Sequence, residues 1–157
     1  MQCHSSKEIL KLQTVYGIIL NLLVKVLVTI GSVATIGFGI WHFFIPKIWK
    51  WQSYIDVNAT ELVLAIRAIN AFFSLSLVLF GIMNLLFMYA DKPNRYSIMV
   101  TLASSSVLWV TRVAFQIIYP QGSMNPTLQY GMLSVFIVVF LCYAISLVIM
   151  LTRNAVA

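Results

Sequence analysis

The chain has 157 residues, of which 61% are hydrophobic and 9% charged, and its mean hydropathy is +0.95. Soluble globular domains carry about 25% charged residues, so this composition excludes that class and indicates a membrane protein. The net charge is +6. We interpret this charge as a consequence of membrane topology, and it gives no support for nucleic-acid binding.

Four apolar runs are long enough to cross a bilayer, which takes about 20 residues. They lie at about residues 24–45, 62–88, 98–118 and 130–151. The segments between them are too short for a soluble domain, so residues 1–157 are expected to form a single membrane domain. The predicted fold is all-α, a four-transmembrane-helix bundle. Residues 9–23 are also largely apolar, so the first helix is expected to start early, with its opening turns along the inner membrane surface.

The basic residues outside the apolar runs predict the orientation of this bundle. One side would carry only Lys47 and Lys50, whereas the other would carry Lys7, Lys11, Lys25, Lys92, Arg95 and Arg153. Lysine and arginine concentrate in cytoplasmic loops, so both termini are predicted to be cytoplasmic. The predicted location is the bacterial cytoplasmic (inner) membrane.

The segment GIWHFFIPKIWKW closes the first apolar run at residues 39–51. Pro46 is predicted to end the first helix, because proline has no backbone N–H for the helical hydrogen bond. Trp49, Trp51 and Tyr54 follow as predicted interfacial anchors. Aromatic side chains with an apolar body and a polar tip favour the boundary between membrane and water.

Arg67 and Arg112 fall inside apolar runs, where a charge at the bilayer centre costs about 2.5–3.5 kcal/mol. With a rise of about 1.5 Å per residue, both are expected roughly 7–9 Å below the outer boundary. His42 is expected slightly closer to that boundary. Three consecutive helices would therefore place a basic or potentially basic group at a similar depth.

Polar and small residues recur at helical spacing on three of the runs. They are Ser32, Thr35, Gly39 and His42 on the first, Arg67, Asn70, Ser74, Gly81 and Asn84 on the second, and Ser105, Trp109, Arg112, Gln116 and Tyr119 on the third. Small residues allow close helix approach, and hydroxyl and amide groups form hydrogen bonds across helices. We therefore predict that these faces meet inside the bundle. The fourth run has fewer such residues, namely Ser134, Cys142, Tyr143 and Ser146, and is expected to cover the side.

Two interpretations of the intramembrane polar residues stay open. In the first, the arginines extend outward and bind phosphates, helix-end carbonyls, Asp56 or Glu61. In the second, five residues line an outward-facing ligand pocket: His42, Arg67, Asn70, Arg112 and Gln116. A guanidinium group would suit an anionic or carbonyl-bearing head group there, because its planar donors match such oxygens.

Missing motifs narrow the range of functions. No Asp or Glu lies within an apolar run, which disfavours a cation or proton antiporter built on a membrane carboxylate. One histidine lies within a run, so a single chain cannot supply a bis-histidine haem site. Cys3 and Cys142 are expected to be free thiols, and no metal site is expected. No hydrolase, thiol-redox or nucleotide-binding motif occurs, so the sequence favours a non-enzymatic protein.

Three segments carry a resemblance to a known group: GIWHFFIP, IRAIN and WVTRVAFQIIYPQGS. Together with the hydropathy of most of the chain, they resemble short bacterial inner-membrane proteins that are broadly DoxX-like. The resemblance implies a four-helix bundle with polar residues near the outer face. Some members of that wider group are described as subunits or partners of membrane redox systems that work with quinone.

The sequence therefore leads to a leading hypothesis and two alternatives. The leading hypothesis is a small polytopic membrane protein, either an accessory subunit or a binder of a lipid or quinone-type ligand, with a polar pocket near the outer face. One alternative is a redox-linked subunit that interacts with quinone or haem, and the other is a small transporter. The bilayer is the expected partner, and a homo-oligomer or a second membrane protein is compatible with the small-residue faces.

Overall fold

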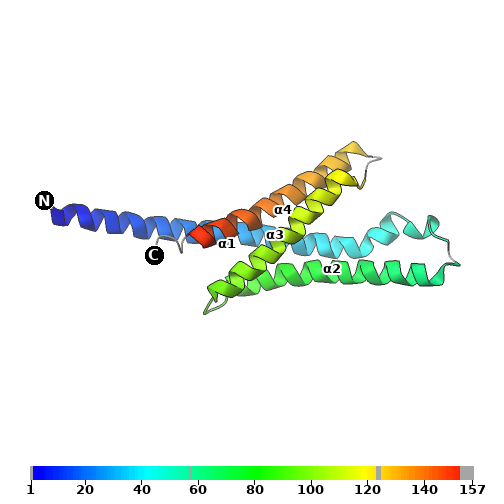
Figure 1. The fold of residues 1–157 in the computed structure, drawn as a ribbon, viewed down its shortest axis with the longest axis horizontal. Coiled ribbons are helices and arrows are strands. Elements are labelled where there is room, and N and C mark those ends of the chain that lie inside the picture. The colour runs from blue at the N-terminus through cyan, green and yellow to red at the C-terminus, as the bar shows by residue number, and fades with distance from the viewer. Residues whose placement is uncertain (1, 57, 123–124, 153–157) are drawn as a thin grey trace.

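The computed structural model describes residues 2–56, 58–122 and 125–152, with the backbone alone for residues 2–12. Its elements are α1 (Gln2–Ile48), the short 3₁₀ helix η1 (Trp51–Ser53), α2 (Thr60–Met88), α3 (Arg95–Ile118) and α4 (Pro126–Thr152) (Figure 1). These ranges contain no strand. All four α-helices are long and apolar enough to cross a membrane. The all-α, four-helix prediction is confirmed, whereas the side of the membrane that each end occupies stays a prediction.

The helix boundaries agree with the predicted spans to within about one turn for α2, α3 and α4. The difference is at α1, which has 47 residues and starts at Gln2. The expected early start is confirmed, and the extension continues the axis of α1 beyond the other helices (Figure 1). The expectations for the side chains of Cys3, Lys7, Lys11 and Arg153 lie outside the described part of the chain.

Pro46 lies inside α1, so the prediction that it ends the helix is wrong by two residues. Pro46 has no backbone N–H, so this part of the helix loses one hydrogen bond. The helix nevertheless continues past it, and Trp49 N–H donates to the Ile45 carbonyl at 2.9 Å. The helix ends where Lys50 adopts a left-handed conformation, with φ 49° and ψ 44°. A left-handed residue at this position is a common way to terminate a helix.

Asparagine is favoured at helix N-caps, and the sequence predicts Asn58 in that position before Glu61. Glu61 does lie in the first turn of α2, but the N-cap is Ala59, and it forms no side-chain capping bond. Asn58 instead donates to Asp56 Oδ1, from its backbone N–H at 2.9 Å and its side-chain amide at 3.1 Å. Asn58 therefore forms a local turn with Asp56 instead of capping α2.

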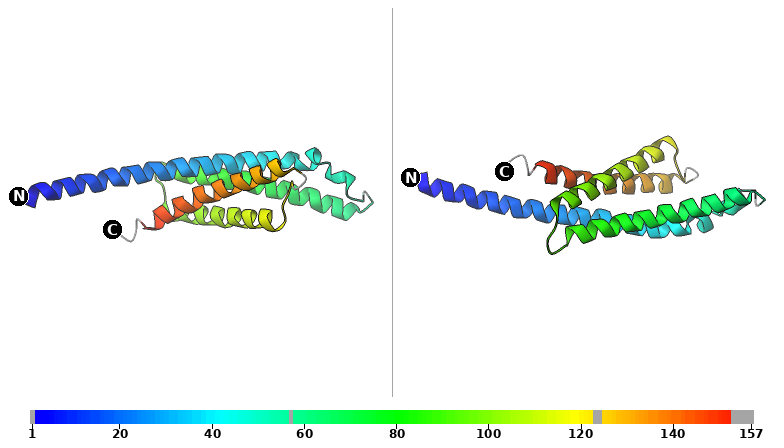
Figure 2. Two further views of the ribbon diagram at one scale, coloured as in Figure 1. Left: turned by 90° about the horizontal axis from the view of Figure 1, so that it is seen from above. Right: turned by 60° about the horizontal axis from the view of Figure 1, so that its bottom comes forward.

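The four helices form two antiparallel hairpins, α1–α2 and α3–α4. Figure 1 shows α3 and α4 side by side and oblique to α1 and α2. Figure 2 shows the hairpins as two layers that are close at the α2–α3 turn and diverge toward the α1–α2 and α3–α4 connections. Contacts between the layers are mainly between α1 and α4, and α2 touches α3 much less.

Two glycines set the close approach of α1 and α2. A Cβ added at Gly39 would lie 2.9 Å from the Ser74 carbonyl oxygen, and one at Gly81 would lie 2.8 Å from the Ser32 carbonyl oxygen. Each helix thus presents a glycine to the backbone of the other. This reciprocal arrangement is the close packing expected from small residues at a helix interface in a membrane.

Thr35 connects three helices in the core. Its hydroxyl lies 3.0 Å from the Tyr143 hydroxyl on α4 and accepts from Trp109 Nε1 on α3 at 3.1 Å. Between α2 and α3, the Asn84 amide donates to Ser105 Oγ at 2.8 Å. These bonds use hydroxyl and amide groups whose exposure to lipid would leave them without partners.

The predicted meeting of the polar faces is confirmed by burial. The buried members are Ser32, Thr35, Gly39, Asn70, Ser74, Gly81, Asn84, Ser105, Trp109, Gln116, Cys142, Tyr143 and Ser146. Arg67, Tyr119 and Ser134 are exposed, so these three do not face the interior. α4 does more than cover the side, because Tyr143 is fully buried and bonded to α1.

Candidate polar cavity

A cavity of about 320 Å³ lies at the divergent end, between the two hairpins. Three polar side chains predicted for a ligand site line it: His42 from α1, Asn70 from α2 and Arg112 from α3. The remaining wall is mainly aromatic and aliphatic, and consists of Phe38, Trp41, Ile45, Trp49, Trp51, Ile66, Ile69, Phe73, Met132 and the loop residue Gln121. A concave, mostly apolar site with a few convergent polar groups is typical of small-molecule binding sites.

Arg112 is partly buried against two phenyl rings. Its guanidinium carbon lies 4.7 Å from the centre of the Phe136 ring and 5.9 Å from the centre of the Phe38 ring. Its Nη2 donates to Gln121 Oε1 at 2.5 Å, which ties it to the α3–α4 loop. The Nε of Arg112 is buried without a hydrogen-bond partner. The aromatic rings and Gln121 therefore hold the charge in place and leave one donor unused.

His42 is on α1 and lines the same cavity as this arginine, which is on α3. Its ring packs edge-on against Phe73 with ring centres 4.8 Å apart, and its Nδ1 lies 3.4 Å from Ser74 Oγ. Ser74 is fully buried and also donates to the Asn70 carbonyl at 2.7 Å. These contacts fix the imidazole in the cavity wall, where either tautomer can offer a donor or an acceptor.

Asn70 supplies an unused acceptor. The residue is 7% exposed, and its Oδ1 accepts no hydrogen bond of ordinary geometry, although the His42 ring lies close enough to interact with it. A buried polar atom without a partner costs about 1–3 kcal/mol, so such atoms are uncommon. The same wall thus holds an unpaired acceptor on Asn70 and an unpaired donor on Arg112.

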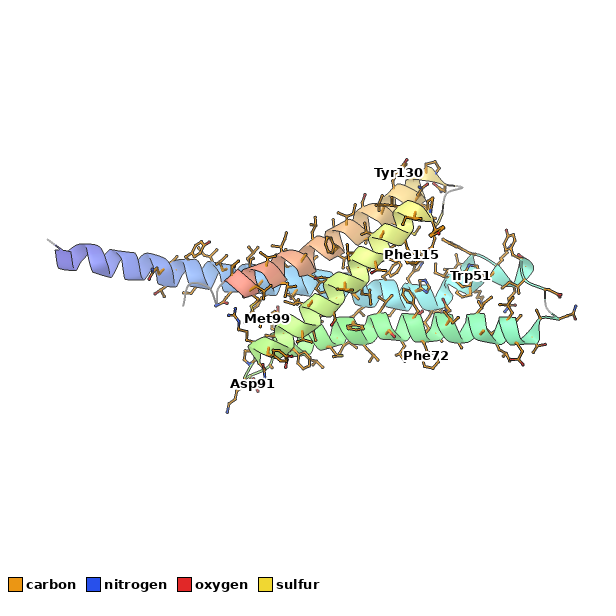
Figure 3. All side chains as sticks on the ribbon, viewed as in Figure 1. Trp51, Phe72, Asp91, Met99, Phe115 and Tyr130 are labelled. Carbon is orange, nitrogen blue, oxygen red and sulfur yellow. The ribbon has the colours of Figure 1, made fainter. Side chains whose placement is uncertain are left out.

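A second space adjoins the polar cavity on the side where α2 and α3 diverge. This α2–α3 groove measures about 470 Å³ and shares Phe38, Phe73 and Arg112 with the cavity. Its other lining residues are Leu77, Ser104, Val107, Leu108, Trp109, Thr111 and Phe115. Figure 3 shows Phe115 on α3 toward the end at which the hairpins diverge. The groove is thus a mostly apolar extension of a cavity whose polar groups lie at one end.

Arg67 and Gln116, the other two predicted site residues, lie elsewhere. Arg67 is exposed and lines a separate pocket with the end of α1, so it does not share the cavity of His42 and Arg112. Gln116 is 1% exposed and donates to the Gln121 carbonyl at 2.9 Å, so it supports the loop that contacts Arg112. The structure brings three of the five predicted residues together, and their ligand-binding role stays a prediction.

The predicted interfacial anchors differ from one another in the structure. Tyr54 is 85% exposed, as an anchor would be. Trp49 and Trp51 are partly buried and line the polar cavity, and Trp49 also packs against the hydrophobic core. In Figure 3 Trp51 lies just past the end of α1. The two tryptophans therefore line the cavity where α1 ends.

Sequence reasoning missed the aromatic residues that hold the arginine. Phe38 and Phe136 lie in runs of apolar residues, where one phenylalanine cannot be told from another. The signal that could have identified Phe38 is its position four residues before His42 and three after Thr35, on the same helix face. Gln121 carries no comparable signal, because it lies in a loop.

No group of three or more His, Cys, Asp or Glu residues lies close enough to bind a metal ion within the described ranges. The fold and the cavity define a class: an all-helical, multi-pass membrane protein, by the length and composition of its helices, with a polar cavity between two hairpins. Comparison of the chain with protein-family models, curated proteins and solved structures found no match.

Proposed function

We propose that the chain is a non-enzymatic, multi-pass protein of the bacterial cytoplasmic membrane that binds a membrane-soluble amphiphile, a lipid or a quinone-type molecule. The head group would occupy the polar cavity and the tail the α2–α3 groove. The observation that carries this proposal is the pair of unpartnered polar atoms, Asn70 Oδ1 and Arg112 Nε, in the wall of one cavity with His42.

The head group requires oxygen acceptors and a donor. Arg112 would donate to a carbonyl, carboxylate or phosphate oxygen, because its Nε is free and its charge is held by aromatic rings rather than by a carboxylate. Asn70 Oδ1 would accept from a hydroxyl of the ligand. His42 would supply either a donor or an acceptor, according to its tautomer.

The tail requires an apolar path that opens toward lipid. The α2–α3 groove offers this path, since Phe73 and Leu77 of α2 face Val107 and Leu108 of α3 across it. Its connection to the polar cavity at Arg112 matches the linear order of polar head and apolar tail in an amphiphile. Burial of the tail would contribute about 25 cal/mol for each Å² of apolar surface removed from water, and less where lipid already covers it.

The topology proposed with this function has both ends in the cytoplasm and the cavity near the outer face. Lys47 and Lys50 follow the cavity-lining part of α1, while Lys25, Lys92 and Arg95 lie toward the α2–α3 turn. This distribution of basic residues supports the orientation through the positive-inside rule.

The test is identification of what co-purifies with the full chain in a mild detergent. Organic extracts of wild type and of the double variant Asn70→Leu/Arg112→Gln are compared by mass spectrometry and by absorption. We expect the bound amphiphile per protein to fall at least about tenfold in the double variant, equivalent to about 1.4 kcal/mol or more of lost binding free energy.

Lys25→Gln is the matched control, because it also removes a positive charge from a membrane helix but at a position that lines neither the polar cavity nor the pocket of Arg67. It should retain the ligand, and circular dichroism should show that all variants remain helical. Full retention of ligand by the folded double variant would contradict the proposal, as would a wild-type extract free of lipid and quinone. The same extract separates a quinone from a lipid, and a haem absorption band would favour the redox-linked alternative.

A further inference from the structure

A cluster of positive charges lies in a separate pocket of the α1–α2 hairpin, outside the polar cavity. Lys47 and Lys50 from the end of α1 and Arg67 from α2 line one pocket of about 610 Å³. Gln52 and Ser53 of the intervening η1 helix add an amide and a hydroxyl, and Phe43, Pro46 and Ala71 form its apolar side. Asn70 is the one residue that lines both this pocket and the polar cavity. We call these three cations the basic triad.

The basic triad has no counter-charge in the described part of the chain. No acidic residue lines the pocket, and the three basic side chains make no hydrogen bond or ion pair. Asp56, the acidic residue next along the chain, accepts from Asn58 instead. Positive charges held close together repel one another, and the repulsion is larger where lipid lowers the local dielectric constant.

Part of this charge is offset by the helix end. The carbonyl end of α1 carries about half a negative charge, and Lys47 lies in its last turn. Three full positive charges exceed this half charge several-fold. The pocket therefore has a net positive field even after the helix dipole is included.

The backbone at Lys50 brings the triad together at some energetic cost. Lys50 has positive φ, a conformation that costs a residue with a Cβ roughly 1–2 kcal/mol. Its carbonyl accepts from the Ser53 backbone N–H at 2.9 Å and from the Ser53 hydroxyl at 2.8 Å, which holds the turn.

We propose that the basic triad is a second binding site, for the phosphate of a lipid head group in the leaflet at this end of the bundle. Arg67 would hold two phosphate oxygens with its planar donors, and the lysines would act as point charges. The apolar side formed by Phe43, Pro46 and Ala71 favours a lipid over a free ion, because acyl chains can continue along it. The three cations do not line the polar cavity, although the two pockets adjoin at Asn70, so this site takes a ligand other than the amphiphile proposed there.

The test measures binding of short-chain phosphatidylglycerol to the full chain in detergent, by native mass spectrometry or a thermal-shift titration. Lys47→Gln/Arg67→Gln should weaken this binding at least about tenfold, and the charge-preserving Lys47→Arg/Arg67→Lys should change it less than about threefold. Lys25→Gln/Lys92→Gln is the matched control, because it removes the same charge at the opposite end of the bundle. It should bind like wild type.

Competing ligands and salt distinguish a lipid site from a site for a free anion. Diacylglycerol, which lacks the phosphate, should not compete, and added salt should weaken binding because it screens the charges. Competition by low-millimolar inorganic phosphate would assign the triad to a free oxyanion and overturn the lipid assignment. Unchanged binding in the folded Lys47→Gln/Arg67→Gln variant would overturn the site altogether. Arg112→Gln should leave this binding intact, so failure here is distinguishable from failure of the proposed function.

Discussion

At the level of single residues, the contrast between Arg67 and Arg112 shows what helical spacing can and cannot predict. Arg67 is seven residues from Ser74 and fourteen from Gly81, and all three lie on the side of α2 toward α1, but Arg67 is exposed near the end of α1 whereas Ser74 and Gly81 are buried. The prediction of this face was therefore sound. Arg112 of α3 instead approaches α1 beside Phe38 and lines the same cavity as His42 and Asn70. Periodicity gives the rotation of a residue about its own helix but not the side from which a neighbouring helix packs.

Thr35 is expected to be the most sensitive polar residue of the core. Thr35→Val would remove the acceptor of Trp109 Nε1 and the partner of the Tyr143 hydroxyl. Hydrogen bonds between membrane helices contribute about 0.6 kcal/mol on average and up to about 1.7 kcal/mol. We expect the free energy of unfolding in mixed micelles to fall by about 1–2 kcal/mol. Thr111→Val is the control, because Thr111 is exposed and bonds within its own helix; an equal loss in both variants would contradict the connecting role of Thr35.

At the level of helices, the packing of α1 on α2 depends on backbone contact that only glycine permits. Sequence spacing predicted that small residues would face one another, and Gly39 and Gly81 confirm it. The spacing could not predict how close the backbones come, because that distance depends on the partner residue opposite each glycine. The helix ends were harder to predict than the helices. Around Pro46 the helix continues through bonds such as Trp49 N–H to the Ile45 carbonyl, and Asn58 bonds to Asp56 instead of capping α2.

Gly81→Ala should destabilise the α1–α2 hairpin. The new Cβ would lie 2.5 Å from Ile36 Cγ1 and 2.8 Å from the Ser32 carbonyl oxygen, and the backbone oxygen cannot move without shifting α1. Overpacking of this kind costs typically about 1–3 kcal/mol. Gly37→Ala is the matched control, because a Cβ there meets nothing within 4 Å. Chemical unfolding should show a loss for Gly81→Ala and no loss for Gly37→Ala, and the reverse order would show that the glycine contact is unimportant.

Asn94 should stabilise α3 through its cap. Its side-chain oxygen accepts from the Tyr96 N–H at 2.9 Å and the Ser97 N–H at 3.3 Å. Replacement of an N-cap asparagine by alanine costs about 0.5–2 kcal/mol. We expect Asn94→Ala to lower the unfolding free energy by about 1 kcal/mol, while Asn58→Ala changes it by less than about 0.5 kcal/mol. A larger effect of Asn58→Ala would restore the original prediction that Asn58 caps α2.

At the level of the whole molecule, composition and apolar run length were sufficient to predict the four helices and their order. They could not predict that the hairpins would diverge, because no local signal records the angle between two layers. The location of the polar cavity is therefore known from the structure alone, although three residues predicted for a ligand pocket, His42, Asn70 and Arg112, line it. The apolar run at residues 24–45 underestimated the length of α1. The helix has 47 residues and extends about 70 Å, more than twice the hydrocarbon thickness of about 30 Å.

The proposed topology predicts opposite accessibility of the two helix connections. In a background with both native cysteines replaced, Tyr54→Cys should react with a membrane-impermeant thiol reagent added to intact cells. Lys92→Cys should react only after the cells are opened, because it lies in the α2–α3 turn at the other end of the bundle. Reaction of Lys92→Cys in intact cells, with Tyr54→Cys protected, would invert the orientation and place the polar cavity near the cytoplasmic face.

The two hairpins are joined by a short turn, so a small change of the angle at this turn would give a larger displacement at their far ends. This turn lies between Met88 and Arg95, and α3 extends about 36 Å from it through 24 residues. A rotation of α3 by about 5° about this turn would displace the far end of α3 by about 3 Å, roughly the diameter of a water molecule. A ligand that widened the angle between the hairpins would therefore separate their far ends, where a neighbouring protein in the same bilayer could detect the change.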